Sequence, residues 1–471
     1  MKVKKPWEPP VILPHRLGEI NKFGNRICRD EVEETVFGLN VEELVERFGS
    51  PLFVSSESKL RANIRRLKRV FESRYAGPVV HAWSYKTNYT SAICNILHQE
   101  SSWAEVVSAF EYQKARWLGV PPERIIFNGP NKDEEILRQA VSEGARIHID
   151  HMDELRLLER IAKDLDKVVE VSLRLNFDTG FSEPWYRFGF NIESGQAHHA
   201  ASAVAFSANL KLTGLHSHIG TFITEPRAYE AQVRIMAKFM REVEERGEGL
   251  IEYFDVGGGF PSVNSLKGVY LPPEQTIADL SEYAEVICGT LMEETQYRRR
   301  DGRSLPMLIL ESGRAVVDDT QVLIASVVGG KRLPDGRRAV VLDAGTNLLF
   351  TAFWYRHKVK LTAPNQGLPA DTALFGPLCM NIDEVRASIQ LPPLKPGDRL
   401  LFKSVGAYNN SQWMQFIEYR PNVVLVDRHG EVQVIRKAEN LESMTAHDLL
   451  PEHLKSPLLS AGDPALRGAS K

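Results

Sequence analysis

An alternation of short apolar runs with amphipathic helical patterns, from about residue 52 to 314, constrains the fold of this chain more than any other feature. Nine apolar runs are predicted as strands: residues 51–56, 79–86, 103–108, 124–129, 146–150, 169–177, 211–220, 253–260 and 307–313. Between several of them, for example over residues 109–120 and 151–165, apolar residues recur three and four positions apart, which is typical of helices. Repeated β-α units imply a parallel sheet, and so many units favour an α/β fold with a closed (β/α)8 barrel over an open sheet.

A different pattern begins at about residue 320, where strand-like runs come with little helix. These runs are residues 320–330, 337–345, 399–405 and 422–436, and turn sequences such as PDG and RHG separate them. We therefore predict a barrel domain over residues 52–318 and a C-terminal all-β domain over residues 319–450. Residues 1–51 are expected to join the β domain, and residues 451–471, rich in small and turn-forming residues, are expected to form a flexible tail.

Charge and hydropathy argue against several classes of function. The formal net charge of -3 gives no electrostatic case for nucleic acid as the principal partner. We find no run of about 18 apolar residues that could span a membrane and no signal-peptide pattern, so we expect a cytoplasmic protein with no membrane partner. The four cysteines lie far apart without a CxxC pair, which favours neither a zinc site nor a disulfide framework.

Unusual polar residues follow the predicted strands at the end of a barrel where active sites form. Lys86 ends the second run, His218 lies near the end of the seventh, and the glycines 257–259 end the eighth. Glu311 lies near the end of the ninth, and Arg314 follows it. Structural residues would not be expected to gather on one face, so this coincidence predicts an active site there.

Taken singly, these residues also have structural explanations. The glycines 257–259 could form a plain turn as readily as an anion-binding one, because GxxxxGK[ST] is missing. Glu311 and Arg314 could form a surface ion pair. His216 and His218 could bind a metal, but no acidic or cysteine partner stands at a suitable spacing, so we predict no metal site.

Six stretches, taken in order, carry a resemblance to a known family. They are HAWSYKTNYT (81–90), HSHIG (216–220), DVGGGFP (255–261), ESGR (311–314), GPLCMNID (376–383) and GAY (406–408). Together they resemble the fold type III pyridoxal-phosphate decarboxylases, which include diaminopimelate, ornithine and arginine decarboxylases. Residues 127–136, 150–158 and 186–190 are similar to the diaminopimelate decarboxylase branch.

The resemblance implies an alanine-racemase-like barrel followed by a β domain, pyridoxal 5'-phosphate as cofactor, an amino-acid substrate and a homodimer with shared active sites. The implied catalytic residues are Lys86, Cys379, His218 and Glu311. The residues implied to bind the cofactor are Lys86 as a Schiff base, His218, Thr221, Gly257, Gly258, Gly259, Glu311, Arg314 and Tyr408. The implied substrate contacts are Arg314, Tyr355, Met380 and Asp383, with Cys379 and Asp383 reaching the site of the other subunit.

The chemistry of such an enzyme explains these residue types. The cofactor is an electron sink for the carbanion that remains when carbon dioxide leaves. An anionic Glu311 keeps the ring nitrogen protonated, whereas the related racemases carry an arginine there, so Glu311 favours decarboxylation over racemisation. Partial desolvation is expected to leave Lys86 enough free amine for exchange with the substrate amine, and Cys379 is expected to protonate the carbanion.

The chain departs from the diaminopimelate branch where the far end of the substrate is expected to bind. Met380 and Asn381 replace the glutamate and serine of the usual Cys-Glu-Ser-x-Asp, and Thr351 stands where the branch carries an arginine, although Tyr355 is kept. A free distal carboxylate and ammonium would then lack partners, which argues against meso-diaminopimelate. The expected substrate is another amino acid, either a diamino acid, which could be D-configured, or a conjugated amino acid.

Two other functions remain open from the sequence. A catalytically silent regulatory relative is disfavoured because Lys86, His218, Glu311 and Cys379 are all retained. An amino-acid racemase is disfavoured by Glu311.

Overall fold

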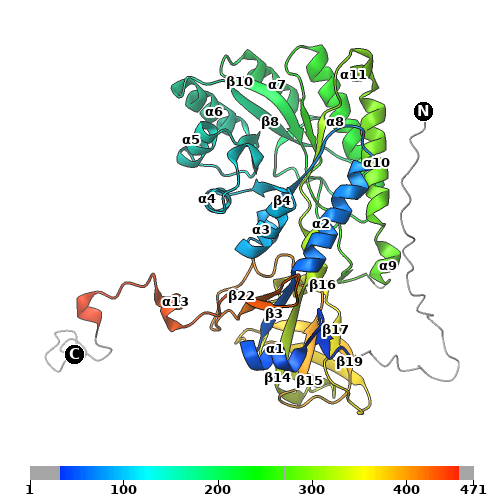
Figure 1. The fold of residues 1–471 in the computed structure, drawn as a ribbon, viewed down its shortest axis with the longest axis vertical. Coiled ribbons are helices and arrows are strands. Elements are labelled where there is room, and N and C mark those ends of the chain that lie inside the picture. Colours follow the sequence, from blue (N-terminus) through cyan, green and yellow to red (C-terminus); the bar gives the residue numbers. More distant parts are fainter. Residues whose placement is uncertain (1–31, 270, 456–471) are drawn as a thin grey trace, which may run out of the picture.

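The structure, a computed structural model, describes residues 32–269 and 271–455. A barrel with its surrounding helices lies above a sheet domain, and the long helix α2 (Glu57–Glu72) rises from the sheet domain along the barrel (Figure 1). Most of the tail predicted over residues 451–471 lies outside the described residues, as do residues 1–31 with Cys28.

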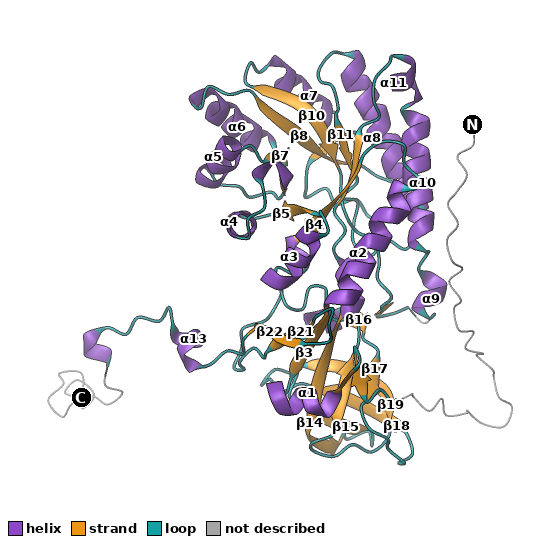
Figure 2. Ribbon diagram, in the orientation of Figure 1, coloured by secondary structure: helices purple, strands orange, loops and turns teal. Residues whose placement is uncertain are grey.

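Eight parallel strands form the barrel, as predicted. They are β4 (Val79–Ser84), β5 (Trp103–Val106), β6 (Ile125–Phe127), β7 (Arg146–Ile149), β8 (Val169–Asn176), β10 (Leu210–His216), β11 (Tyr253–Asp255) and β13 (Met307–Leu310). The ring closes because β8 pairs with β10 and β13 pairs with β4, and helices surround it (Figure 2). The C-terminal ends of all eight strands therefore meet at one face, where barrels place active sites.

Several of the helices combine an apolar stripe with capping residues at their ends. The main barrel helices after α2 are α3 (Ser91–Gln99), α4 (Ala109–Trp117), α5 (Glu134–Glu143), α6 (Met152–Asp164), α7 (Gln196–Phe206), α8 (Arg227–Glu245) and α10 (Leu280–Glu294). In α5 the Asp133 side chain accepts a hydrogen bond from the Ile136 amide, and Gly144 ends the helix with a left-handed φ of 91°. Both termini thus follow from the sequence.

The sheet domain is built around the long strand β14 (Gln321–Arg332), which pairs with β15, β3 and β20. Its other strands are β3 (Leu52–Ser56), β15 (Arg338–Leu342), β17 (Val359–Leu361), β18 (Ala370–Phe375), β19 (Glu384–Leu391), β20 (Arg399–Phe402), β21 (Val423–Val426) and β22 (Val432–Arg436). The β-rich C-terminal domain is therefore as predicted.

The strand predicted first in the barrel belongs instead to the sheet domain. β3 pairs antiparallel with β14 and parallel with β21, and all five of its residues are buried. A short run that is buried on both faces fits the centre of either sheet, so its sequence could not show which sheet it joins.

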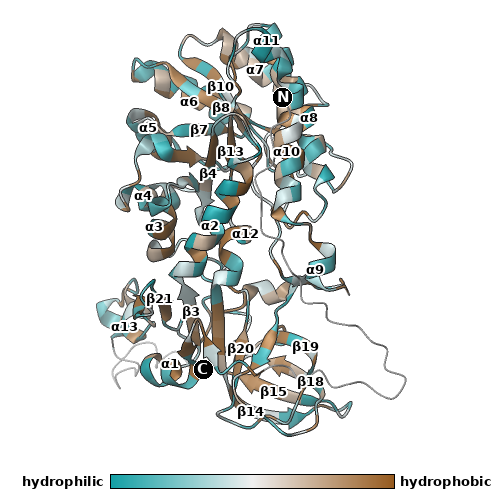
Figure 3. Ribbon diagram, turned by 45° about the vertical axis from the view of Figure 1, so that its right-hand side comes forward, coloured by the Kyte–Doolittle hydropathy of each residue, from teal (hydrophilic) through white to brown (hydrophobic). Residues whose placement is uncertain are grey.

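Residues ahead of β3 pack on the same sheet domain. Helix α1 (Val41–Phe48) buries Val41 and Leu44 in a cluster with Val54 and Ile324. The larger apolar core lies between the barrel strands and their helices, while polar residues cover the outer helix faces (Figure 3). Among the described residues, no helix is long and apolar enough to cross a membrane.

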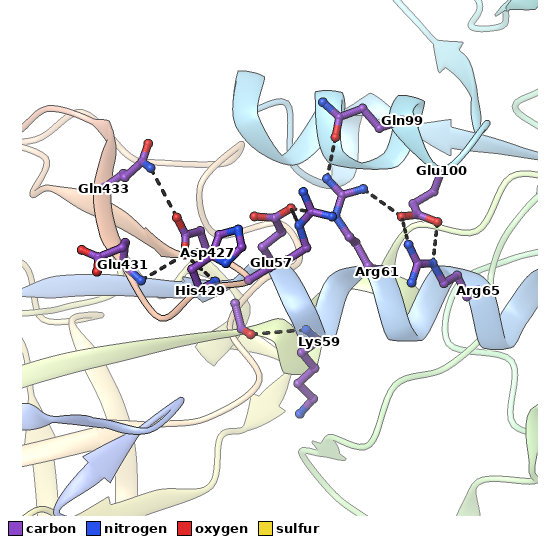
Figure 4. Close-up of polar contacts among 12 residues, drawn as sticks. Glu57, Lys59, Arg61, Arg65, Gln99, Glu100, Asp427, His429, Glu431 and Gln433 are labelled. Atoms are coloured by element: carbon purple, nitrogen blue, oxygen red, sulfur yellow. Dashed lines mark hydrogen bonds and ion pairs between the residues drawn. The ribbon is translucent and has the colours of Figure 1, made fainter.

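A charged network joins the two domains at the N-terminal end of α2. Arg61 donates from Nε to Glu57 at 2.7 Å and from Nη1 to Glu100 at 2.8 Å, and Arg65 also binds Glu100 (Figure 4). Arg428, from the turn between β21 and β22, lies 3.3 Å from the same Glu57 carboxylate. The network thus connects the sheet domain, α2 and the end of α3.

Candidate active site

Lys86 lies in a 3-10 turn, Tyr85–Thr87, directly after β4 at the active face of the barrel. Its Nζ is 2.6 Å from Oε2 of Glu105, a side chain on β5 that is 1% exposed. Burial lowers the pKa of Lys86, but the nearby charges of Glu105 and Glu311 outweigh it and raise the pKa above its usual value. The expectation of a free amine is therefore wrong for the chain by itself, because the carboxylates hold the ammonium form.

Glu311 follows β13 and is nearly buried, with an exposed fraction of 5%. Its Oε1 accepts a hydrogen bond from Nδ2 of Asn128 at 2.6 Å, and its Oε2 lies 3.3 Å from Nε2 of His216. The Asn128 amide also donates to Oε1 of Glu105 at 3.1 Å, so it links the two carboxylates. Burial, and then the charge of Glu311, raise the pKa of Asp255 well above its usual range. Burial thus favours the neutral form of the Asp255 carboxyl beside Glu311.

The three glycines after β11 form a close-packed turn. Gly257 and Gly259 have positive φ values of 68° and 94°, and a Cβ on Gly258 would lie 2.5 Å from the carbonyl oxygen of Glu311. The Gly257 amide donates to Oδ1 of Asp255 at 2.8 Å, and the Gly258 amide donates to Nδ1 of His218 at 3.0 Å. Two of the amides expected to face an anion are thus already bonded, which leaves Gly259 as the candidate.

The imidazole of His218 is held between the glycine turn and an aromatic loop. Trp185, on the loop after β8, meets it edge to face, with ring centroids 5.3 Å apart at 70°. Burial, followed by the charge of Lys86, lowers the pKa of His218 well below its usual value, so the ring is neutral. Both rings line a pocket that Arg174 also lines, and the Arg174 guanidinium lies 4.3 Å from the ring centre of Phe188.

Arg314, at the start of the short helix α12 (Arg314–Val317), is packed among aromatic rings. Its guanidinium carbon lies 4.7 Å from the ring centre of Tyr408 and 5.2 Å from that of Tyr355. Its Nη2 donates to Oγ1 of Thr221 at 3.2 Å. The structure therefore brings together four residues that the sequence predicted for the phosphate and substrate.

Comparison with known proteins decides the family. Residues 58–318 match the family model "Pyridoxal-dependent decarboxylase, pyridoxal binding domain", and residues 288–406 match "Pyridoxal-dependent decarboxylase, C-terminal sheet domain". The chain belongs to the pyridoxal-dependent decarboxylases. The predicted family, fold class, cofactor and enzyme class are thereby confirmed: this is a pyridoxal-phosphate-dependent amino-acid decarboxylase.

Relatives extend the likeness over nearly the whole chain. A diaminopimelate decarboxylase of Methanothermobacter thermautotrophicus is 30% identical over 88% of this chain and 96% of its own length. That of Methanocaldococcus jannaschii is 29% identical over 88% of this chain and 95% of its own. The crystal structure of the M. jannaschii enzyme has a TM-score of 0.81 at 27% identity, covering 90% of this chain and 98% of that one.

The buried polar atoms of this decarboxylase fit pyridoxal phosphate. Nη1 of Arg314 and the hydroxyl of Tyr355 are buried and have no hydrogen-bond partner in the described part of the chain. A phosphate or carboxylate oxygen would satisfy both atoms. Lys86 offers an amine for the carbonyl of the cofactor, and Glu311 offers a carboxylate for its ring nitrogen.

Asp383 was predicted as a substrate contact, and its hydrogen bonds contradict that prediction. One carboxylate oxygen accepts from the amide and hydroxyl of Thr346, at 2.7 and 3.1 Å, and the other accepts from the Leu378 amide at 2.8 Å. The side chain is 3% exposed and packs against Gly345 and Gly376. Asp383 therefore shapes the turn before β19 rather than facing a substrate.

Cys379 and Met380 lie on the loop between β18 and β19, outside the packed barrel face. Cys379 is exposed and Met380 is half-buried. Exposure within one chain is compatible with the expectation that the loop completes the site of a second subunit, which stays a prediction.

Thr351 occupies the position where the diaminopimelate branch carries an arginine, and it is fully buried. Its hydroxyl lies 2.8 Å from Nε2 of His357 and donates to Oδ1 of Asn409 at 2.9 Å. Its amide donates to the same oxygen at 3.2 Å. The polar atoms of Thr351 are thus used within the sheet domain.

A metal site inside this barrel does not follow from the polar residues. Among the described residues, one donor atom each of His148, His216 and Glu311 lie within 4.8 Å of one another. Glu311 already accepts from Asn128, and the spread is wider than ligands of a single ion at about 2.0–2.2 Å allow. We assign no ion to this cluster.

Sequence reasoning missed several residues that the fold brings to the site. They are Glu105, Asn128, Arg174, Trp185 and Asp255. All but Trp185 are polar residues inside or just after a predicted barrel strand, the same signal that identified Lys86 and Glu311. Trp185 carries no such signal, because it lies on a loop.

Proposed function

We propose that this chain decarboxylates a diamino acid, with pyridoxal phosphate joined covalently to Lys86. The observation that carries the proposal is the placement of Lys86 and Glu311 at the ends of the paired strands β4 and β13, linked through Glu105 and Asn128. When bound, the cofactor supplies an electron sink for the electron pair left by the departing carboxylate. The residues around it have to hold the amine, the ring nitrogen and the phosphate.

Each of these tasks has a candidate residue. Glu105 holds the Nζ of Lys86 in place and can accept its proton, which would leave the free amine that the cofactor carbonyl needs, and Glu311 would keep a proton on the ring nitrogen. The neutral state favoured for Asp255 limits charge repulsion next to Glu311. Arg314 provides positive charge for the phosphate.

The remaining cofactor residues would act as the sequence implied, except that the amides of Gly257 and Gly258 are already bonded within the protein. His218, whose pKa is lowered by burial, would stack on the cofactor ring. Tyr408, Thr221 and the Gly259 amide complete the phosphate site.

The comparisons make meso-diaminopimelate the first candidate substrate. Each of the relatives compared above is a diaminopimelate decarboxylase, so the expectation against this substrate is not supported. A second candidate is a diamino acid with an uncharged or conjugated far end. It is favoured by the apolar Met380 and by Thr351, whose hydroxyl is engaged by His357 and Asn409.

Carbon dioxide release from carboxyl-labelled amino acids tests both candidates. The panel should contain meso-diaminopimelate, L- and D-lysine, ornithine, arginine and glutamyl- or citryl-conjugated diamino acids. We expect one diamino acid to be turned over, with release by Lys86→Ala lower on the order of 10³-fold. Racemisation without carbon dioxide release, or no turnover and no cofactor binding, would contradict the proposal.

We further propose a homodimer in which Cys379 acts in the site of the partner subunit. Exposure of the Cys379 thiol in a single chain supports this arrangement. Mixing Lys86→Ala with Cys379→Ala subunits should restore activity, because one of the two sites in a mixed dimer then has both groups intact. Two inactive variants that stay inactive after exchange of subunits would contradict shared sites.

A further inference from the structure

We propose that the loop 405–411 of the sheet domain clamps the backbone of the Lys86 turn, with Ser411 as the residue that positions the reactive lysine. The inference rests on the proposed function in that Lys86 is taken as the cofactor lysine. The clamp itself is defined by hydrogen bonds between residues 86–89 and 406–411.

The centre of the clamp is the hydroxyl of Ser411. It donates to the carbonyl oxygen of Lys86 at 2.7 Å and to that of Thr87 at 3.1 Å. The amide of Tyr408 donates to the same Thr87 oxygen at 2.8 Å. The sheet domain thus supplies two hydrogen-bond donors, the Ser411 hydroxyl and the Tyr408 amide. They bind the carbonyl groups of Lys86 and of the next residue, which fixes the backbone that carries the lysine side chain.

Asn88 extends the clamp by one residue. Its Nδ2 donates to the carbonyl oxygen of Gly406 at 3.0 Å, and its Oδ1 accepts from the Thr90 amide at 3.1 Å. The side chain is fully buried, so these bonds are shielded from water. The Tyr89 hydroxyl adds a longer contact to the Ser411 carbonyl oxygen at 3.4 Å.

The loop is anchored on its other side, so it can act as a fixed support. Asp318 accepts from the Gly406 amide through its backbone oxygen at 2.9 Å and from the Ala407 amide through Oδ1 at 3.3 Å. A Cβ on Gly406 would lie 2.1 Å from the Val317 oxygen, which shows how closely loop and barrel approach. The loop therefore cannot shift without moving the segment that follows Arg314.

The need for a clamp follows from the local structure of the lysine turn. A single 3-10 turn leaves its last carbonyl groups without partners inside the turn. The turn Tyr85–Thr87 has no side-chain cap at its start, and its end at Asn88 is extended. Ser411 and Tyr408 satisfy these carbonyl groups, which fixes the root of the flexible Lys86 chain opposite Glu105.

Ser411→Ala tests the clamp, with Ser411→Thr as the conservative variant and Ser50→Ala as the matched control. Ser50 lies beside the sheet domain, and its hydroxyl also makes two hydrogen bonds, to Ser326 and Asp343, which Ser50→Ala removes. Two measurements are made: amide hydrogen exchange of the peptide holding residues 85–90 without cofactor, and the rate at which borohydride fixes pyridoxal phosphate on Lys86. For Ser411→Ala we expect exchange about tenfold faster and fixation about tenfold slower, the scale of one lost hydrogen bond.

The outcomes separate the clamp from the proposed function. Recovery of both rates in Ser411→Thr and unchanged rates in Ser50→Ala support the clamp. If amide exchange at residues 85–90 in Ser411→Ala stays at the parental rate, the clamp is wrong. If exchange changes but borohydride fixes the cofactor at the parental rate, Ser411 does not position Lys86. If the parent chain never fixes cofactor on Lys86 but its amide exchange still depends on Ser411, the proposed function is wrong and the clamp is supported. If Ser411→Ala does not fold, Ser411→Cys keeps the volume and weakens the donor.

Discussion

The floor of the active site and its distal wall use their polar groups in opposite ways. In the floor, formed by Lys86, Glu105, Asn128 and Glu311, charged groups are joined by short hydrogen bonds at strand ends of the barrel. For the distal wall we propose Thr351, Met380 and Asn381 of the sheet domain, and there the Thr351 hydroxyl is engaged within the domain.

This difference suggests that reaction type and substrate choice are encoded in separate parts of the molecule. The floor carries what any amino-acid decarboxylation with this cofactor needs. The wall carries the departures from the diaminopimelate branch. Changes in the floor should therefore reduce turnover of every substrate, and changes in the wall should alter the ratio between substrates.

The largest effect is expected from Lys86→Ala. The variant loses the amine that joins the cofactor, so turnover should fall on the order of 10³-fold for all substrates. Steady-state carbon dioxide release measures it. Lys114→Ala, which removes a partly buried lysine on α4, is the control and should keep parental turnover. A substrate that Lys86→Ala still converts at the parental rate would refute the role of the floor.

Glu311→Gln should reduce turnover about 10²-fold, again for every substrate. The amide keeps the shape of the side chain but removes the negative charge that holds a proton on the ring nitrogen. Glu123→Gln, an exposed carboxylate ahead of β6, controls for the charge change. An effect confined to one substrate would place Glu311 in substrate recognition instead.

Acid should destabilise the wall through His357. Burial lowers its pKa to about 4, against about 6.5 for an unfolded histidine, so between these values only the unfolded chain takes up the proton. The contribution to stability is complete above about pH 6.5 and falls as the pH drops toward 4, by about 2 kcal/mol at pH 5.

Urea unfolding of the parent and of His357→Gln at pH 7 and pH 5 measures this contribution. The parent should lose more stability than the variant on acidification. His429→Gln, on an exposed turn, should behave like the parent. Equal losses in the parent and His357→Gln would show that His357 does not titrate as its burial implies.

The smallest effect is expected from Met380→Glu. A carboxylate at this position restores a partner for a distal ammonium, so the preference for meso-diaminopimelate over a diamino acid whose distal amine is conjugated should rise about tenfold. Competition between the two substrates measures the ratio. Ile382→Glu adds the same charge at an exposed position two residues away and should leave the ratio unchanged. A fall in the turnover of both substrates would show that the floor and the wall act as one functional unit.

The sequence predicted the barrel well, because each barrel strand is a separate apolar run between helical patterns. It placed β3 in the wrong sheet, because burial on both faces is common to both domains. It identified Lys86 and Glu311 by their strand ends, yet missed Glu105, which reaches Lys86 through the pairing of β4 with β5, and Asn128, which reaches Glu311 through the curvature of the closed ring.

The errors in the site have physical causes as well. Asp383 was assigned to the substrate from its motif, but its carboxylate accepts hydrogen bonds from backbone amides. These amides come together only in the folded turn. The raised pKa of Lys86 depends on Glu105, nineteen positions further along the chain and adjacent only through the pairing of β4 with β5. Such contacts follow from tertiary structure rather than from sequence spacing.

Peptide mapping of the borohydride-reduced protein, loaded with pyridoxal phosphate in the absence of substrate, tests the central claim most directly. The account predicts that the cofactor is fixed on the peptide that contains Lys86, and that Lys86→Ala carries no label at any other lysine. Label on a different lysine, or none on a parent chain that still releases carbon dioxide, would contradict it.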